Sequence, residues 1–357
     1  MTISDVSLSA PRSLRRHRGL TRYGAAREEV AGLLGDVPHY RIDQIWDGLY
    51  VGLRTPVEMT NLPKRLRDDV DRLLPTELTA VAETISDAGD TVKFLSAIDG
   101  GHQVETVLML YRDRATVCVS SQAGCAMGCG FCATGQAGFG RHLTTGEIVE
   151  QVVIASRRAR STGRRLSNVV FMGMGEPLAN EASVWGATQR IHDDIGLSAR
   201  HITLSTVGVV PGIRALAARR LPVTLAVSIH AANDAARDEL VPINRRYPLD
   251  SLVGACQDYI DVTGRRVSFE WAMIEGVNDR SADSVELARL AGRLRPSAHV
   301  NLIPLNPTPG WPTTGSPPAR VRQFRDELGA LKIGATIRRN RGTDIDAACG
   351  QLAARHR

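Results

Sequence analysis

The sequence predicts an α/β protein in which an incomplete parallel barrel follows a small helical domain. From about residue 90 onward, apolar β-branched runs alternate with helical patterns, which is typical of a parallel sheet with right-handed crossovers. Before about residue 75, helical periodicity occurs without the alternation expected of strands. About six strand–helix units are too few to close an eight-stranded barrel, so we expect an open (β/α)6 barrel.

The helical domain is predicted over residues 23–90. One face of its first clear helix carries four apolar residues, Ile42, Ile45, Leu49 and Leu53. A later helix begins near Pro63, which suits a first-turn position. The outer face of that helix carries three basic residues, Lys64, Arg65 and Arg67.

The barrel is predicted over residues 91–357. Its strands are expected at residues 115–120, 168–173, 201–206, 223–229, 267–274, 299–305 and 333–338. Its helices are expected at residues 144–160, 182–195, 249–262, 281–294 and 318–331. Thr144 and Glu147 have the spacing of a capping box at the start of the first of these helices. Polar residues follow several strands, and in parallel α/β proteins the carboxyl ends of strands build the active site.

Residues 1–22 differ from the rest of the chain in composition. They are rich in arginine and serine and poor in acidic residues. They lack the apolar segment of a secretion signal. We expect a disordered basic arm, with an organelle presequence as the alternative.

The chain carries an excess of positive charge, with a formal net charge of +6 and a pI of about 9.2. Arginine doublets such as Arg157–Arg158 and Arg245–Arg246 fit either a polyanionic partner or a solvated basic surface. Six cysteines, four of them within residues 118–132, do not resemble a disulfide framework, so we expect a reducing cytoplasm. No apolar run reaches the length of a membrane span, and we expect a monomer without membrane contact.

Three cysteines, Cys125, Cys129 and Cys132, follow the spacing CxxxCxxC. One interpretation is a structural zinc site with Cys118 as the fourth ligand, but zinc sites usually come as paired knuckles. The other is a 4Fe–4S cluster that leaves one iron free for a further ligand. The spacing, with Phe131 just before the last cysteine, favours the cluster.

This motif resembles the radical S-adenosylmethionine signature, in which the cofactor chelates the open iron. The segment Gly-Met-Gly-Glu-Pro at residues 173–177 resembles the segment that holds the cofactor's amino group. Three longer stretches, at residues 120–152, 299–310 and 341–353, resemble the ribosomal-RNA adenine C2-methyltransferases. The likeness runs from about Tyr40 to Leu352. It implies a partial barrel of the radical S-adenosylmethionine type, with the helical domain as an RNA-binding accessory domain.

The resemblance implies methylation of carbon 2 of an adenine in 23S rRNA, and of an adenine in the anticodon-loop region of tRNA. It implies one 4Fe–4S cluster held by Cys125, Cys129 and Cys132, and two molecules of S-adenosylmethionine. It also implies an electron donor of the flavodoxin or ferredoxin type.

Three further residues would react with the substrate if the resemblance holds. Cys349 would carry the transferred carbon, Cys118 would release the product through a transient disulfide, and Glu105 would accept the carbon-2 proton. From the local pattern alone, Glu105 is better explained as a solvated edge-strand residue. Cys118 alone fits a small buried strand residue, and Cys349 fits a helix-packing one. Cys256 lies in a plain amphipathic helix, and we assign it no role.

Seven residues at successive strand ends are expected to contact S-adenosylmethionine: Gly175, Glu176, Ser205, Ser228, Ile229, His230 and Asn306. Individually each fits a turn or cap residue, and His230 fits a core imidazole with its hydrogen bonds satisfied. As a set they favour binding.

Other functions remain compatible with parts of this pattern. A relative that methylates carbon 8 of the same adenine would share these motifs, and nothing in one sequence separates the two. An iron–sulfur RNA-binding protein without catalysis would leave Cys349 and Glu105 unexplained. A radical enzyme that matures another protein would have no use for the basic surface and the helical domain.

Overall fold

The computed structural model describes residues 20–308 and 310–353. The predicted N-terminal arm, residues 1–22, therefore lies almost entirely outside the described residues. The chain divides into two compact units, Met1–Glu77 and Leu78–Arg357, and each is described by itself.

The first unit is helical. It contains α1 (Arg27–Leu34), α2 (His39–Tyr50), a 3-10 turn (Pro56–Glu58) and α3 (Lys64–Leu73). Ile42, Ile45 and Leu49 of α2 are buried, as their spacing predicts. The rings of Tyr23 and Tyr50 meet edge to face with centroids 5.7 Å apart, which adds an aromatic contact to this small core.

A ten-stranded sheet organises the second unit, in the order β1-β2-β3-β4-β7-β8-β9-β10-β11-β12. Its antiparallel part consists of β1 (Thr79–Ser86), β2 (Thr91–Ile98), β3 (His102–Leu110) and β4 (Arg114–Cys118). Its parallel part continues from β4 through β7 (Arg165–Phe171), β8 (Ile202–Thr206), β9 (Thr224–Ser228), β10 (Ser268–Met273), β11 (His299–Pro304) and β12 (Ala335–Ile337). Within the part of the chain that the structure describes, β1 and β12 each pair on one side only. The barrel is therefore open, as predicted.

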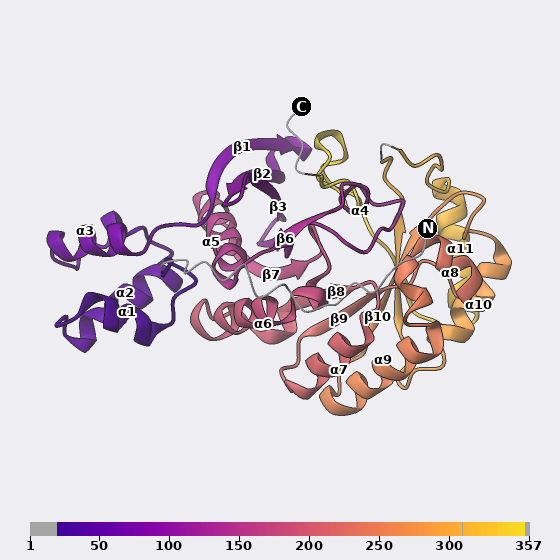
Figure 1. Cartoon of the computed structure of the whole chain (residues 1–357). Coiled ribbons are helices and arrows are strands. Elements are labelled where there is room, and N and C mark those ends of the chain that lie inside the picture. Colours follow the sequence, from indigo (N-terminus) through magenta and orange to yellow (C-terminus); the bar gives the residue numbers. More distant parts are fainter. Residues whose placement is uncertain (1–19, 309, 354–357) are drawn as a thin grey trace. The chain divides into compact units, whose positions relative to one another are not determined.

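Helices connect the consecutive parallel strands. They are α5 (Thr145–Ser161), α6 (Glu181–Gln189), α7 (Val210–Ala218), α8 (Asp234–Leu240), α9 (Leu249–Thr263), α10 (Ser281–Ala291) and α11 (Pro318–Ala330). Figure 1 shows α6, α7, α9 and α10 following one another along the outer side of the sheet. A hairpin of β5 (Gln122–Gly124) and β6 (Phe139–His142) follows β4 and encloses α4 (Ala133–Gln136). Among residues 20–308 and 310–353, no helix combines the length and the apolar character needed to cross a membrane.

All seven strands predicted for the barrel overlap β4 and β7 to β12, but the predicted boundary of the helical domain is wrong. Residues 79–86 form β1 and pair with β2, although they fall inside the range predicted as helical. This strand is exposed over much of its length, so burial imposes no clear alternation on its sequence. Helices α7 and α8 are additional to the predicted ones, and the helix expected at 182–195 ends in a π-helical turn at Arg190–Asp194.

The predicted capping box at the start of α5 is confirmed. Thr144 Oγ1 accepts a hydrogen bond from the backbone N of Glu147 at 3.0 Å, and Glu147 Oε2 accepts one from the N of Thr144 at 2.9 Å. Two guanidinium nitrogens of Arg141 also donate to the Glu147 carboxylate, at 2.8 and 2.6 Å. These bonds fix the junction between the β5–β6 hairpin and α5, and the hairpin carries the cysteine loop.

Candidate active site

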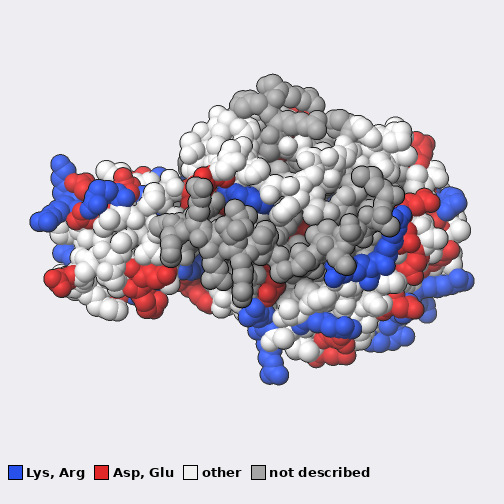
Figure 2. All heavy atoms as spheres, viewed as in Figure 1, with Lys and Arg blue, Asp and Glu red and all other residues white. Residues whose placement is uncertain are grey.

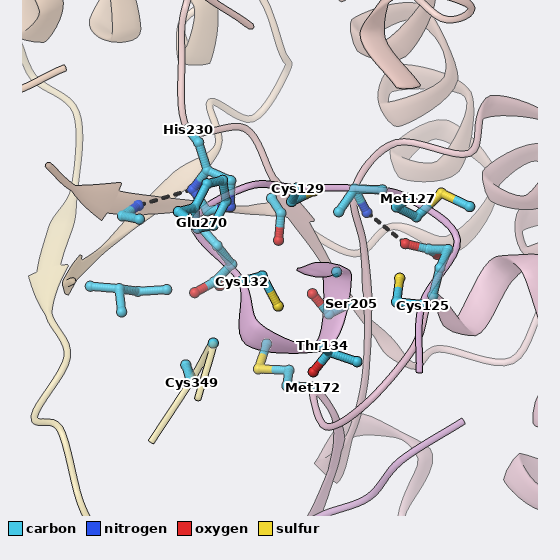
Figure 3. Close-up of a pocket in the computed structure, with 18 of the residues that line it drawn as sticks. Cys125, Met127, Cys129, Cys132, Thr134, Met172, Ser205, His230, Glu270 and Cys349 are labelled. Carbon is cyan, nitrogen blue, oxygen red and sulfur yellow. Dashed lines mark hydrogen bonds between the residues drawn. The ribbon is translucent and has the colours of Figure 1, made fainter. Parts of the chain in front are cut away.

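A cavity opens at the carboxyl ends of the parallel strands (Figure 3). It contains about 1040 Å³ of empty space, counted out to its open mouth. Ten of the predicted site residues line it: Cys125, Cys129, Cys132, Gly175, Glu176, Ser205, Ser228, His230, Asn306 and Cys349. Glu105, Cys118 and Ile229 do not line it. The strand topology thus brings most of the predicted set to one place.

The three clustered cysteines lie on the loop between β5 and β6, just before α4. The backbone N of Cys125 donates to Gly138 O at 2.8 Å, and the N of Cys132 donates to Cys129 O at 3.1 Å. Cys129 is buried in an apolar cluster with Phe131. Figure 3 shows all three cysteines around the cavity. The Cys125–Gly138 hydrogen bond therefore closes the base of the loop, and the three cysteines line the cavity.

This donor set fits an iron–sulfur cluster better than a zinc ion. Burial raises the pKa of Cys125 to about 12 and raises the pKa of Cys129 as well, so a bound cationic centre is needed to favour their thiolates. Cys118, the fourth ligand of the zinc hypothesis, packs elsewhere, against Val107 and Met174. Among the described residues, no group of His, Cys, Asp and Glu is arranged to hold a single metal ion. Three thiols at a cavity suit a cube whose fourth iron is open.

Glu176 lies in the turn after β7 and is buried. Its carboxylate accepts hydrogen bonds from Leu178 N at 2.9 Å and from Val207 N at 2.8 Å. Burial raises the pKa of Glu176 to about 7, although the backbone donors act in the opposite direction. Gly175 before it has φ of 99°, and a Cβ there would lie 2.5 Å from the Cβ of Gln122, so only glycine fits this turn. The turn presents a carboxylate suited to accept hydrogen bonds from a bound amine.

His230 lies just beyond β9 and is held within the protein. Its Nδ1 accepts a hydrogen bond from Ala272 N at 3.0 Å, and its ring packs edge to face on Phe131 with centroids 4.8 Å apart. Burial lowers the pKa of His230 to about 3, so the imidazole is neutral. Ile229 is fully buried, and its N donates to Glu270 O at 3.0 Å. His230 therefore forms part of the cavity wall, whereas Ile229 does not line the cavity.

Cys349 lies in a turn of the C-terminal segment, residues 339–353, so its interpretation as a helix-packing residue is wrong. Asn306 Nδ2 donates to Cys349 O at 3.1 Å, and Asn340 Nδ2 donates to Asn306 Oδ1 at 2.6 Å. Ala133 N donates to Gly350 O at 2.7 Å, which ties the segment to the cysteine loop. The Cys349 side chain is solvent-accessible inside the cavity. The amide of Asn306 thus fixes the segment that presents this thiol.

Cys118, the last residue of β4, lies against the same C-terminal segment. It is buried in an apolar cluster that includes Ala347 and Leu352, on either side of Cys349. Both thiols are free. The structure therefore brings the two predicted reactive cysteines to one segment.

Glu105, on β3, is also connected to the C-terminal segment. Its Oε2 accepts a hydrogen bond from Ala353 N at 2.9 Å, and its Oε1 lies 2.8 Å from Lys93 Nζ. The residue is buried in a strand that pairs on both sides, so the interpretation as a solvated edge residue is wrong. Glu105 lies behind the segment, outside the cavity lining.

Three charged side chains near the cavity are absent from the predicted site. Glu270 on β10 and Arg338 after β12 line the cavity and lie 3.4 Å apart. Arg237 on α8 is fully buried and donates to backbone carbonyls at the ends of β8 and β9. A lone carboxylate in an apolar strand is a signal for Glu270. No such signal marks the two arginines. Arg338 is followed by Arg339, and Arg237 lies among the acidic residues of α8, so both resemble surface charges in the sequence.

Comparison with known proteins shows similarity over most of the chain. A family model described as the radical SAM superfamily matches residues 119–288. A protein of Chloroflexus aurantiacus named "Probable dual-specificity RNA methyltransferase RlmN" is 49% identical, over 89% of this chain and 88% of its own. A protein of the same name from Mycobacterium ulcerans is 48% identical, over 98% of both chains.

A solved structure agrees with these sequence matches. The crystal structure of a radical SAM methyltransferase from Sphaerobacter thermophilus superposes with a TM-score of 0.90 at 49% identity. The superposition covers 94% of this chain and 100% of that one. The chain therefore belongs to the radical SAM superfamily and, within it, to the family of RlmN dual-specificity RNA methyltransferases.

Proposed function

We propose that this chain methylates carbon 2 of an adenine in 23S rRNA and of an adenine in tRNA. The observation that carries the proposal is the meeting of Cys349, Cys118 and Glu105 at one C-terminal segment beside the cysteine loop. Carbon 2 of adenine is electron-poor and has no acidic proton, so direct displacement of a sulfonium methyl group by this carbon is unfavourable. A carrier thiol, a releasing thiol and a base would together provide another route for methylation of this carbon.

The cavity residues would hold the cofactors. Cys125, Cys129 and Cys132 would ligate a 4Fe–4S cluster, and Glu176 would accept a hydrogen bond from the amino group of S-adenosylmethionine. The other predicted contacts are Gly175, Ser205, Ser228, Ile229, His230 and Asn306. When bound, the cluster and two molecules of S-adenosylmethionine would supply a carbon-centred radical and the methyl group.

Cys349 would carry the carbon. Its sulfur would form a bond to the methyl carbon. That carbon would lose one hydrogen atom to the carbon-centred radical and would then bond to the base while still attached to the sulfur, and the remaining unpaired electron would return to the cluster. The Asn306 and Ala133 hydrogen bonds hold the backbone of Cys349 and Gly350 during this step. A fixed tether favours attack at one carbon of the base because the reacting atoms are held close.

Glu105 and Cys118 would complete the reaction. Glu105 would take the proton from carbon 2, which requires its Oε2 to exchange the hydrogen bond from Ala353 N for that proton. Cys118 would then attack the sulfur of Cys349, so that a disulfide forms and the sulfur–carbon bond breaks. The carbon keeps the electron pair and takes a proton to become the methyl group. A cellular thiol reductant would restore both cysteines.

The partners follow from this chemistry. We propose an electron donor of the flavodoxin or ferredoxin type, a reducing cytoplasm and a monomeric enzyme. The helical unit would contribute to RNA binding. The names of the relatives, which specify RNA, support the substrate class.

The decisive experiment uses an rRNA fragment deuterated at carbon 2 of the target adenine. Anaerobically reconstituted protein receives this RNA, S-adenosylmethionine and a reductant, and the digested nucleosides are analysed by mass spectrometry. Methylated adenosine without deuterium is expected. Methylated adenosine that keeps the deuterium would instead indicate carbon 8. Formation of 5′-deoxyadenosine without methylated RNA would overturn the substrate assignment. Glu105→Gln should slow product formation by roughly 10²–10⁴-fold if it is the base.

A further inference from the structure

Arg338 occupies a distinctive position on the cavity wall. Among the described residues that line the cavity, it is the only lysine or arginine. The histidine of that lining, His230, is neutral because burial lowers its pKa to about 3. Arg338 therefore supplies the fixed positive charge of this wall. We propose that Arg338 is a positioning residue that stabilises the sulfur anion of Cys349, which lines the same cavity, an inference that rests on the proposed role of Cys349 as a nucleophile.

Both cysteines lie in surroundings that oppose ionisation. Cys118 packs among apolar side chains, including Val107 and Leu352, and burial raises its pKa. Desolvation by the protein around the cavity likewise raises the pKa of Cys349. Since the thiolate is the nucleophilic form, a nearby cation would favour the reaction of Cys349 at neutral pH.

The fold holds Arg338 in place without neutralising it. Its backbone N donates to Leu302 O at 2.8 Å. Its Nη2 lies 3.4 Å from Oε2 and 3.5 Å from Oε1 of Glu270, so one nitrogen approaches both oxygens. Oε1 already accepts a hydrogen bond from Asn301 Nδ2 at 2.7 Å and one from Ser268 Oγ at 3.2 Å. The contact is longer than a forked arginine–carboxylate pair, so Glu270 orients the guanidinium while its charge still acts on the cavity.

The charges that face the two sulfurs come from several elements. Arg338, after β12, lowers the pKa of both thiols, whereas Glu270 on β10 and Cys132 on the cysteine loop raise that of Cys349. The two thiols also oppose each other's ionisation, since Cys349 raises the pKa of Cys118. Lys93, the cation on β2, is paired with Glu105 at 2.8 Å. In the described part of the cavity lining, Arg338 is thus the one cation that can act on the sulfur of Cys349.

Each step uses one sulfur anion and balances without a further oxidant. In methyl transfer, the sulfur–carbon bond of Cys349 forms as the sulfonium carbon–sulfur bond breaks, and the leaving sulfur keeps the electron pair. In release, the Cys118–Cys349 bond forms as the sulfur–carbon bond breaks, and the carbon keeps the pair and gains a proton. In both steps the thiol proton has already passed to water.

The test measures alkylation of Cys349 by iodoacetamide as a function of pH. Anaerobic, cluster-loaded protein is used without S-adenosylmethionine, and the tryptic peptide 342–355, whose only cysteine is Cys349, is quantified by mass spectrometry. Arg338→Gln should move the midpoint of the pH profile upward by roughly one to two pH units. Arg338→Lys should restore most of the shift. Arg339→Gln, the neighbouring exposed arginine, should match the unchanged protein.

The pH midpoint of Cys349 alkylation decides between the outcomes, and the alkylation rate at high pH does not. A loosened segment would raise the limiting rate without moving the midpoint, and that result overturns the proposal. If Arg338→Gln does not fold, Glu270→Gln provides the second test, because loss of that carboxylate should lower the midpoint. An unchanged or raised midpoint in Glu270→Gln also overturns the proposal. No RNA is involved, so a failure to methylate adenine would leave this result intact.

Discussion

Each buried carboxylate near the cavity has partners that compensate its charge. Glu105 pairs with Lys93, Glu270 accepts hydrogen bonds from Asn301 and Ser268, and Glu176 accepts two backbone hydrogen bonds. Removal of one partner from a buried charged pair typically costs about 3–5 kcal/mol, because the other charge is left uncompensated. These side chains are therefore placed by electrostatics as much as by packing.

Cys118 gives the sharpest prediction for a single residue. Under the proposed mechanism, Cys118→Ala should still allow the carbon to join the base, because that step would use Cys349, but it would remove the thiol that breaks the sulfur–carbon bond. RNA should then remain covalently bound to the protein, with turnover limited to one RNA per chain. Denaturing electrophoresis with labelled RNA would show the slow-moving adduct.

Cys256→Ala is the matched control, because Cys256 is a fully buried thiol in α9, outside the cavity lining. It should turn over normally and trap no RNA. Free methylated RNA from Cys118→Ala, in amounts beyond one per chain, would contradict the releasing role.

The polar residues at the ends of β8 and β9 are held by an element behind them. Arg237 of α8 donates to Val207 O at 2.6 Å, to Ser228 O at 3.2 Å and to Ile229 O at 3.1 Å. Burial lowers the pKa of Arg237 to about 10, so it remains charged at neutral pH. One guanidinium thus fixes the spacing of two neighbouring strand ends that face the cavity.

Helices α10 and α11 are joined by a carboxylate that makes stability depend on pH. Two nitrogens of Arg320 donate to the two oxygens of Glu327 at 2.8 Å each, and Ser281 Oγ donates at 2.9 Å. The Arg320 hydrogen bonds lower the pKa of Glu327 from 4.5 to about 2. The folded state therefore favours the ionised form, and this stabilisation is complete above pH 4.5 and is lost as the pH falls toward 2.

Glu327→Gln should lower the free energy of unfolding at pH 7 by about 1–2 kcal/mol, since it removes charge-assisted hydrogen bonds. The difference from the unchanged protein should shrink as the pH falls below 4.5. Urea unfolding of cluster-free protein at a series of pH values measures it. Asp326→Asn, which alters the exposed pair with Arg325, should have little effect at any pH. A difference between Glu327→Gln and the unchanged protein that does not shrink between pH 4.5 and pH 2 would refute the linkage.

The helices and strands differ in how clearly their burial can be recognised from the sequence. Most of the parallel strands form apolar runs with several buried residues, as in β9 and β10, so their positions could be predicted, together with the cysteine loop and the polar strand ends. Strand β1 is largely exposed and left no such pattern. Arg338 could not be identified because its partner Glu270 lies 68 residues away. The burial of Glu105 and its ion pair with Lys93 could not be predicted either, because both depend on the folded chain.

Charge is distributed unevenly over the whole molecule. Residues 20–77 contain ten acidic and eight basic side chains, although the entire chain has a net charge of +6. Figure 2 shows both signs over the part of the view that α3 occupies in Figure 1. Any contact of this unit with RNA must therefore depend on local groups, such as the exposed Lys64 and Arg65 at the start of α3.

The proposed role of the helical unit can be tested by reversing those charges. Lys64→Glu with Arg65→Glu should weaken RNA binding and reduce the slope of log affinity against log salt by roughly 1–2, because each lost phosphate contact removes about 0.7–0.9. Binding titrations at several salt concentrations measure both quantities. Arg322→Glu with Arg325→Glu, on α11, is the matched control. Equal losses in the two double variants would mean that only overall charge matters.

The C-terminal position of Cys349 determines the order in which a ribosome completes the site. The ribosome makes Cys132 more than 200 residues before Cys349, which is roughly 10 to 40 s at ordinary elongation rates. During that interval the nascent chain has the cysteine loop but lacks the proposed carrier thiol, Cys349, and the turn that bonds to Ala133. A chain interrupted late in translation would possess the cofactor residues without the means to hold a carbon. The proposed carrier thiol is therefore made only after all the proposed cofactor residues.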